Sequence, residues 1–256
     1  MADHPQLGQN GSEPLAPPIP ADYYWRNFRV VIDTVLEHRR ALLSEQELEQ
    51  IEGLLACSKP AQQLFVRLLS RKGERFRRTR LGYAEIPDID AAIDELAVAG
   101  FLQVDPVELL AGAAILGTLT VPELKQLAAH LDLETAGRKD ELLTRVAAGD
   151  PGRIRRWLGK TDRFLLLQGV QPFLVAQVLF FGNRRQDLTE FVLVDLRIST
   201  YEPVEVDYGH PLFPDREALE EYLLAAARWD AGYTAAEELD LETLGKLGGE
   251  AWEALA

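Results

Sequence analysis

Two groups of positively charged residues have the clearest chemistry in this sequence. The first lies between residues 67 and 80, where seven arginines and lysines accompany one glutamate. The second is the pair Arg138 and Lys139, which directly follows Gly137. Guanidinium and ammonium groups gathered in this way attract phosphate oxygens. The residues that we expect to contact phosphate are Arg71, Lys72, Arg75, Arg77, Arg78, Arg80, Arg138 and Lys139.

Two short helices joined by an extended turn would position the second group. Thr120 can cap a helix on which Leu124, Leu127 and Leu131 share one face. Glycine before the second helix allows the backbone to approach a ligand closely, and the free N–H groups of the helix start favour a phosphate. The stretch 119–146 resembles the SAP domain, a helix-extended-helix module that binds DNA. An ordinary helical hairpin with a solvated basic turn is the alternative.

The composition excludes several classes of site. One cysteine, Cys57, allows no internal disulfide and no thiolate metal cluster, and the four histidines are scattered without ligand spacing. The formal net charge of −14 argues at first against nucleic acid, but residues 201–256 alone hold fourteen acids and three cations. The basic residues are therefore local. The polar, proline-rich start shows no signal peptide or membrane anchor, so we expect a cytoplasmic protein, associated with the nucleoid if the source is bacterial.

Hydrophobic periodicity and capping residues predict a mainly α fold. Residues 1–21 read as a disordered tail, and residues 22–105 as a winged-helix-like domain. That domain would contain several helices, a basic strand or loop at 76–83 and a closing strand at 101–104. The SAP-like domain follows at 106–160. The remainder, 161–256, reads as a helical region.

Some elements of this last region are clearer than others. The apolar stretch 164–181 is interrupted by glutamine, glycine and proline, which favours a buried helix over a membrane span. A second clear helix is expected at 217–229. Residues 191–198 fit a strand or a short helix equally well.

The order of several segments is similar to the N-terminal half of the Fanconi-associated nuclease family. The segments are 23–28, 60–73 with its Arg-Lys-Gly turn, 76–86, the SAP-like unit and 180–183. The resemblance covers about residues 22–235. It implies a structure-specific DNA repair nuclease of the phosphodiesterase I type, which acts on flap or branched DNA and in interstrand crosslink repair. In that family a VRR-type nuclease module with a PD-(D/E)xK core follows, and Mg²⁺ or Mn²⁺ is implied for that module.

This sequence departs from the family because the nuclease module is not found in it. Such a site needs two or three carboxylates and a lysine around divalent ions. The only Glu-x-Lys, Glu123–Lys125, lies on a predicted helix behind Pro122. We therefore expect no catalytic residue, no metal site and no cofactor in these 256 residues, and no DNA cleavage by them alone.

The interpretation that follows is the DNA-binding part of a structure-specific nuclease. Its partner would be flap or branched DNA held by phosphate contacts, with no membrane partner and with the oligomeric state left open. A regulator that reads duplex sequence through a helix at 89–99 is the alternative, although the charged residues of that helix are acids. A third reading is a protein-interaction scaffold that docks a basic partner on its acidic C-terminal part.

Overall fold

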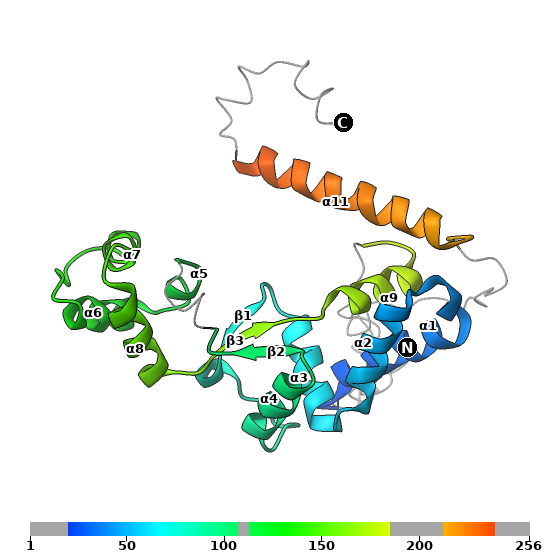
Figure 1. The fold of residues 1–256 in the computed structure, drawn as a ribbon, viewed down its shortest axis with the longest axis horizontal. Helices are drawn as coiled ribbons and strands as arrows, with labels where there is room; N and C mark the ends of the chain where they lie inside the picture. The colour runs from blue at the N-terminus through cyan, green and yellow to red at the C-terminus, as the bar shows by residue number, and fades with distance from the viewer. Residues whose placement is uncertain (1–19, 107–112, 185–211, 239–256) are drawn as a thin grey trace, which may run out of the picture.

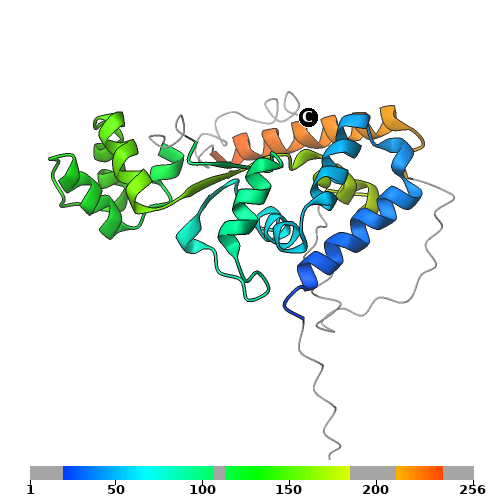
Figure 2. The same cartoon turned by 60° about the horizontal axis from the view of Figure 1, so that its bottom comes forward.

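The computed structural model describes residues 20–106, 113–184 and 212–238, and its fold is mainly α (Figure 1). One lobe contains α1 (Tyr23–His38), α2 (Glu45–Ala56), α3 (Lys59–Leu69), α4 (Ile89–Val98) and α9 (Gln171–Phe181). A smaller lobe contains α5 (Ala113–Leu116), α6 (Val121–His130), α7 (Lys139–Ala147) and α8 (Pro151–Thr161). Both views place α5–α8 at one end of the molecule, with a small sheet between them and α1, α2 and α9 (Figures 1 and 2). The long helix α11 (Arg216–Glu238) lies above α9 in Figure 1.

Side-chain caps define the starts of three helices in the larger lobe. The hydroxyl of Ser44 accepts a hydrogen bond from the Glu47 amide, and the Glu47 carboxylate accepts one from the Ser44 amide. Ser58 caps α3 and Asp88 caps α4. Each of these side chains satisfies an amide that a helix start leaves without a partner, which stabilises the helix by about 1 kcal/mol.

The three strands form one antiparallel sheet in the order β1-β3-β2. β1 (Arg75–Arg77) and β2 (Leu102–Val104) both precede the small lobe, whereas β3 (Phe164–Leu167) follows it and lies between them. The small lobe is therefore inserted between two neighbouring strands.

This topology corrects two expectations about the region after residue 160. The expected boundary at 161 separates β3 from the sheet to which it belongs. Residues 164–167 are also a strand, and only 171–181 form the expected buried helix. A short apolar run does not distinguish a buried strand from a buried helix, and the turn at Gly169, with φ +65°, separates the two here.

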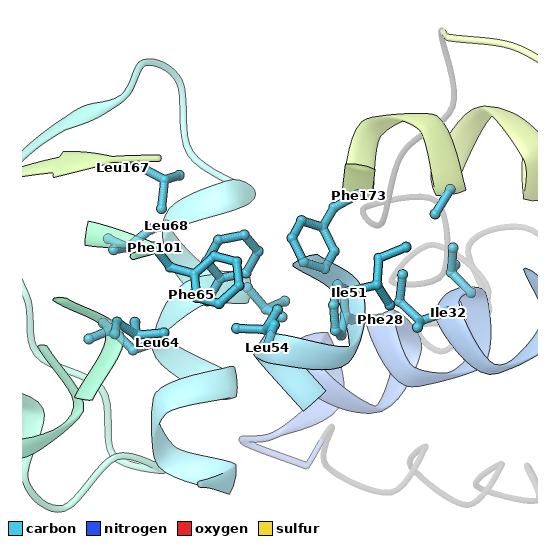
Figure 3. Packing of buried hydrophobic residues seen from close by; sticks show 14 of the residues in the cluster. Phe28, Ile32, Ile51, Leu54, Leu64, Phe65, Leu68, Phe101, Leu167 and Phe173 are labelled. Carbon is cyan, nitrogen blue, oxygen red and sulfur yellow. The ribbon is translucent and has the colours of Figure 1, made fainter. Parts of the chain in front are cut away.

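The larger lobe has an aromatic centre (Figure 3). Phe173 of α9 lies 4.8 Å from Phe65 of α3 and 5.8 Å from Phe28 of α1, measured between ring centroids. Phe101 packs edge-on against Phe65 at 5.3 Å. All four rings are buried, so helices distant in the sequence share one core.

The smaller lobe has its own core. Leu124 and Leu127 of α6, which the sequence places on one helix face, are fully buried, and so are Leu142 and Val146 of α7. Phe164, the first residue of β3, belongs to this second core although its backbone lies in the sheet.

No helix in the described ranges is both long and apolar enough to cross a bilayer. Residues 1–19 of the expected tail, the ambiguous segment 191–198 and the acidic end from 239 lie outside the described residues.

Candidate nucleic-acid interface

The basic turn of the small lobe has a defined backbone. Gly137 adopts φ +128°, a backbone conformation that favours glycine, and a Cβ there would also have to displace the Glu141 carboxylate oxygen, which would stand 2.5 Å away. The extended segment before it is held by Arg145, whose guanidinium donates to the carbonyl oxygens of Glu134 at 2.7 Å and Ala136 at 2.8 Å.

The two cations of this turn are exposed at the start of α7. The Lys139 Nζ donates to the Gly117 carbonyl at 3.0 Å, and the Arg138 amide donates to the Glu141 carboxylate at 3.0 Å. Because Asp140 and Glu141 bring two acids into the first turn, attraction of a phosphate here depends on the side chains of Arg138 and Lys139 more than on the helix dipole.

Part of the larger basic group is already neutralised by carboxylates. Arg78 donates to both oxygens of Asp90, each at 2.8 Å, and this hydrogen bond lowers the pKa of Asp90. Arg77 is only 5% exposed and contacts Glu123 and Asp162. Its burial argues against a phosphate contact, and its partners, 46 and 85 residues away, left no local signal in the sequence.

Four cations of the group remain exposed, three near the turn between α3 and β1 and Arg80 three residues after the end of β1. None of them has an ion pair to any carboxylate in the part of the chain that the structure describes; they are Arg71, Lys72, Arg75 and Arg80. Gly73, with φ +87°, makes this turn, and the Arg71 guanidinium lies 5.8 Å from the ring centre of Tyr83. These side chains can bind phosphates without first breaking an ion pair within the described residues.

The cationic residues between 153 and 163 also include some that form ion pairs and some that are exposed without one in the described residues. Arg153 contacts Asp132, and Arg163 contacts Asp90 and Asp94. Arg156 and Lys160 of α8 are exposed and lack an ion pair within the described ranges. The Thr79 amide donates to Asp162 at 3.1 Å, so the turn that carries Arg80 meets the end of the helix that carries Lys160.

The alternative interpretation, a regulator that reads duplex sequence, would place α4 in a DNA groove. The carboxylates of α4 instead contact other residues of the protein. Asp90 and Asp94 bind Arg78 and Arg163, and Glu95 accepts hydrogen bonds from the amide and hydroxyl of Ser58. α4 also contains no lysine or arginine that could meet a phosphate, which disfavours it as a groove-reading helix.

The Glu123–Lys125 pair does not fit a divalent ion. Both oxygens of Glu123 bind the Arg77 guanidinium, at 2.6 and 2.9 Å, and Thr120 occupies the same carboxylate. Across the described ranges, no group of three or more His, Cys, Asp or Glu side chains is arranged to hold a metal ion. The carboxylate of Glu123 is therefore committed to an internal ion pair.

Comparison with protein families identifies both lobes. The family models described as "FAN1, HTH domain" and "SAP domain" match residues 22–103 and 115–148. This chain belongs to the Fanconi-associated nuclease family. It is similar to a Fanconi-associated nuclease 1 homolog of Pseudomonas aeruginosa, with 35% identity over 78% of this chain and 36% of that protein. Human Fanconi-associated nuclease 1 is 40% identical over 47% of this chain and 12% of its own length.

The solved structures of the family agree in fold. A crystal structure of paFAN1 bound to 5′-flap DNA with a gap superimposes with a TM-score of 0.74 and 32% identity. The match covers 90% of this chain and 42% of that one, and a second flap complex gives a TM-score of 0.72. This member of the Fanconi-associated nucleases thus spans well under half the length of the relatives that it matches. The individual phosphate contacts remain a prediction.

Proposed function

We propose that this chain is the DNA-binding part of a structure-specific nuclease that acts on flap or branched DNA. The observation that carries the proposal is the combination of helix–turn–helix and SAP lobes with exposed cations that have no ion pair in the described residues. The relatives' flap-bound structures support it. Contacts to the phosphate backbone position a protein without reading sequence, which suits recognition of DNA shape.

The proposed contact set follows from exposure and pairing. It contains Arg71, Lys72, Arg75 and Arg80 of the larger lobe and Arg138 and Lys139 of the SAP lobe. Arg77 is left out because it is buried, and Arg78 can contribute only by giving up Asp90.

Catalysis belongs to a different part of the proposal. We infer that cleavage is performed by a nuclease module outside these 256 residues, and that Mg²⁺ or Mn²⁺ serves that module. The role in DNA repair and the cytoplasmic or nucleoid location belong to the same proposal. This chain alone should bind a flap substrate and leave it uncut.

Salt dependence of binding tests the contact set. Removal of one phosphate-neutralising cation should lower the slope of log K against log salt by about 0.9. We expect replacement of four exposed cations by glutamine to reduce the magnitude of this slope by about 3.6, with affinities for unrelated sequences falling equally; the four are Arg71, Lys72, Arg75 and Arg80. Fluorescence anisotropy with a gapped 5′ flap and with plain duplex measures both.

A matched control removes the same number and kind of charges elsewhere. Arg26, Arg29, Arg40 and Lys59 are also three arginines and one lysine, but each already contacts a carboxylate at 2.8 to 3.0 Å. Their replacement by glutamine should leave the slope nearly unchanged. An equal loss in both variants would mean that only net charge matters, and strong preference for one duplex sequence would favour the regulator instead.

A further inference from the structure

One buried arginine joins the two lobes. Arg77 lies on β1 of the larger lobe, and its guanidinium donates to both oxygens of Glu123 on α6 of the SAP lobe, at 2.9 and 2.6 Å. Its Nε donates to Asp162, which lies between α8 and β3, at 2.8 Å. Three segments that are far apart in the sequence therefore meet at one side chain, which joins elements of both lobes.

The partners of Arg77 are themselves held in place. The Asp162 side chain is fully buried and also accepts hydrogen bonds from the amides of Thr79 and Arg163. Glu123 accepts hydrogen bonds from the amide and hydroxyl of Thr120, both at 2.7 Å, as part of the cap of α6. The first turn of α6, in the SAP lobe, is thus bound directly to the sheet of the helix–turn–helix lobe.

Packing reinforces this connection. Phe164 pairs with Arg77 in the sheet, yet its side chain is buried in the core of the SAP lobe. The Arg77 guanidinium lies 5.7 Å from the Phe164 ring centre. A charged network and a shared aromatic residue together restrict rotation of one lobe against the other.

A fixed angle between the lobes has a consequence for the shape of the ligand. The exposed cations Arg71, Lys72, Arg75 and Arg80 belong to the larger lobe, whereas the Arg138–Lys139 turn belongs to the SAP lobe, so this junction connects the two groups. If the two lobes cannot rotate, the cations of both lobes can contact phosphates at the same time only on DNA whose segments run at an angle that matches the angle between the lobes. Such preorganisation lowers the entropy cost of binding the matching shape.

We propose that Arg77, acting through Glu123 and Asp162, is a positioning residue that sets the angle between the helix–turn–helix and SAP lobes and thereby favours flap DNA over straight duplex. The selectivity part of this inference rests on the proposed function. The rigidity part does not, because it concerns the protein without DNA.

The test separates the two parts. Spin labels at Val98→Cys on α4 and Ala129→Cys on α6, both exposed sites, report the distance between the lobes in a Cys57→Ser background. We expect Arg77→Met to broaden the distance distribution without DNA. It should also lower the preference for a gapped flap over duplex by about fivefold or more, while duplex affinity stays the same.

Two further variants keep the result decisive. Arg67→Met breaks a similarly shielded ion pair, Arg67–Glu85 at 2.6 Å, that lies within the larger lobe. It should lower the melting temperature without changing the distance distribution or the flap preference. Should Arg77→Met fail to fold, Glu123→Gln retains an acceptor for Thr120 and removes the charge that faces Arg77, so it takes the same two measurements.

The outcomes are distinct. An unchanged distance distribution, or a broadened one with an unchanged flap preference, would overturn the positioning role. An unmodified chain that binds duplex and flap equally would instead overturn the proposed function, whatever the labels report.

Discussion

Glu123 gives a stability prediction whose size follows from its contacts. The hydrogen bonds from Arg77, followed by those from Thr120, hold the pKa of this carboxyl at about 2, against an ordinary value of 4.5. If the whole shift were realised, the linked stabilisation would be about 3 kcal/mol. Since 21% of the side chain is exposed to water, screening reduces this, and we expect about 1 to 2 kcal/mol at pH 7.

The pH dependence has a definite sign. A carboxyl whose pKa is lowered by folding contributes its stabilisation above the unfolded value of about 4.5, and the contribution is lost as the pH falls towards 2. Glu123→Gln cannot titrate. The variant should therefore be less stable than the unmodified chain at pH 7, and the difference should shrink towards zero as the pH falls from 5 towards 2.

Urea unfolding followed by circular dichroism at several pH values measures this difference. Glu134→Gln is the control, because Glu134 is also in the SAP lobe but its side chain is 70% exposed, 3.5 Å from Arg145. An exposed pair of this kind should contribute little at any pH. A pH-independent deficit in Glu123→Gln, or an equal effect in the control, would refute the reasoning.

Two more predictions concern the SAP lobe. Gly137→Ala should cost about 1 to 2 kcal/mol, seen as a lower urea midpoint, because of its positive φ and the Glu141 carboxylate; Gly159→Ala, whose Cβ would meet open space, should be neutral or stabilising. Phe164→Ala should cost about 3 to 5 kcal/mol and increase amide exchange in residues 120–147, because this strand residue fills the SAP core. Unchanged exchange there would contradict the assignment of Phe164 to that core.

Sequence reasoning succeeded where the deciding signal is local. Thr120 caps its helix in the expected place, and Leu124, Leu127 and Leu131 are buried as their spacing requires. These features depend on residues within one or two turns of each other, so a single sequence contains them in full.

Sequence reasoning failed where a structural feature depends on contacts between residues that are far apart in the sequence. The position of β3 depends on pairing with strands some 60 and 90 residues earlier, and an apolar tetrapeptide does not show which neighbours it will have. In the same way, Arg77 and Arg75 look alike in the sequence, one residue apart. Only the folded chain shows that Arg77 is enclosed by Glu123 and Asp162 while Arg75 remains exposed.

The placement of β3 determines how this molecule can be divided. A fragment that ends near residue 103 contains β1 and β2 but lacks the strand that pairs with both, so it would expose two unpaired edges and invite aggregation. During synthesis the helix–turn–helix lobe likewise cannot complete its sheet until residue 167 has left the ribosome, after the whole SAP lobe. Asp105 and Phe164 are joined by hydrogen bonds of 2.7 and 2.8 Å, so an internal deletion closed by a short turn between them is the way to obtain the first lobe alone.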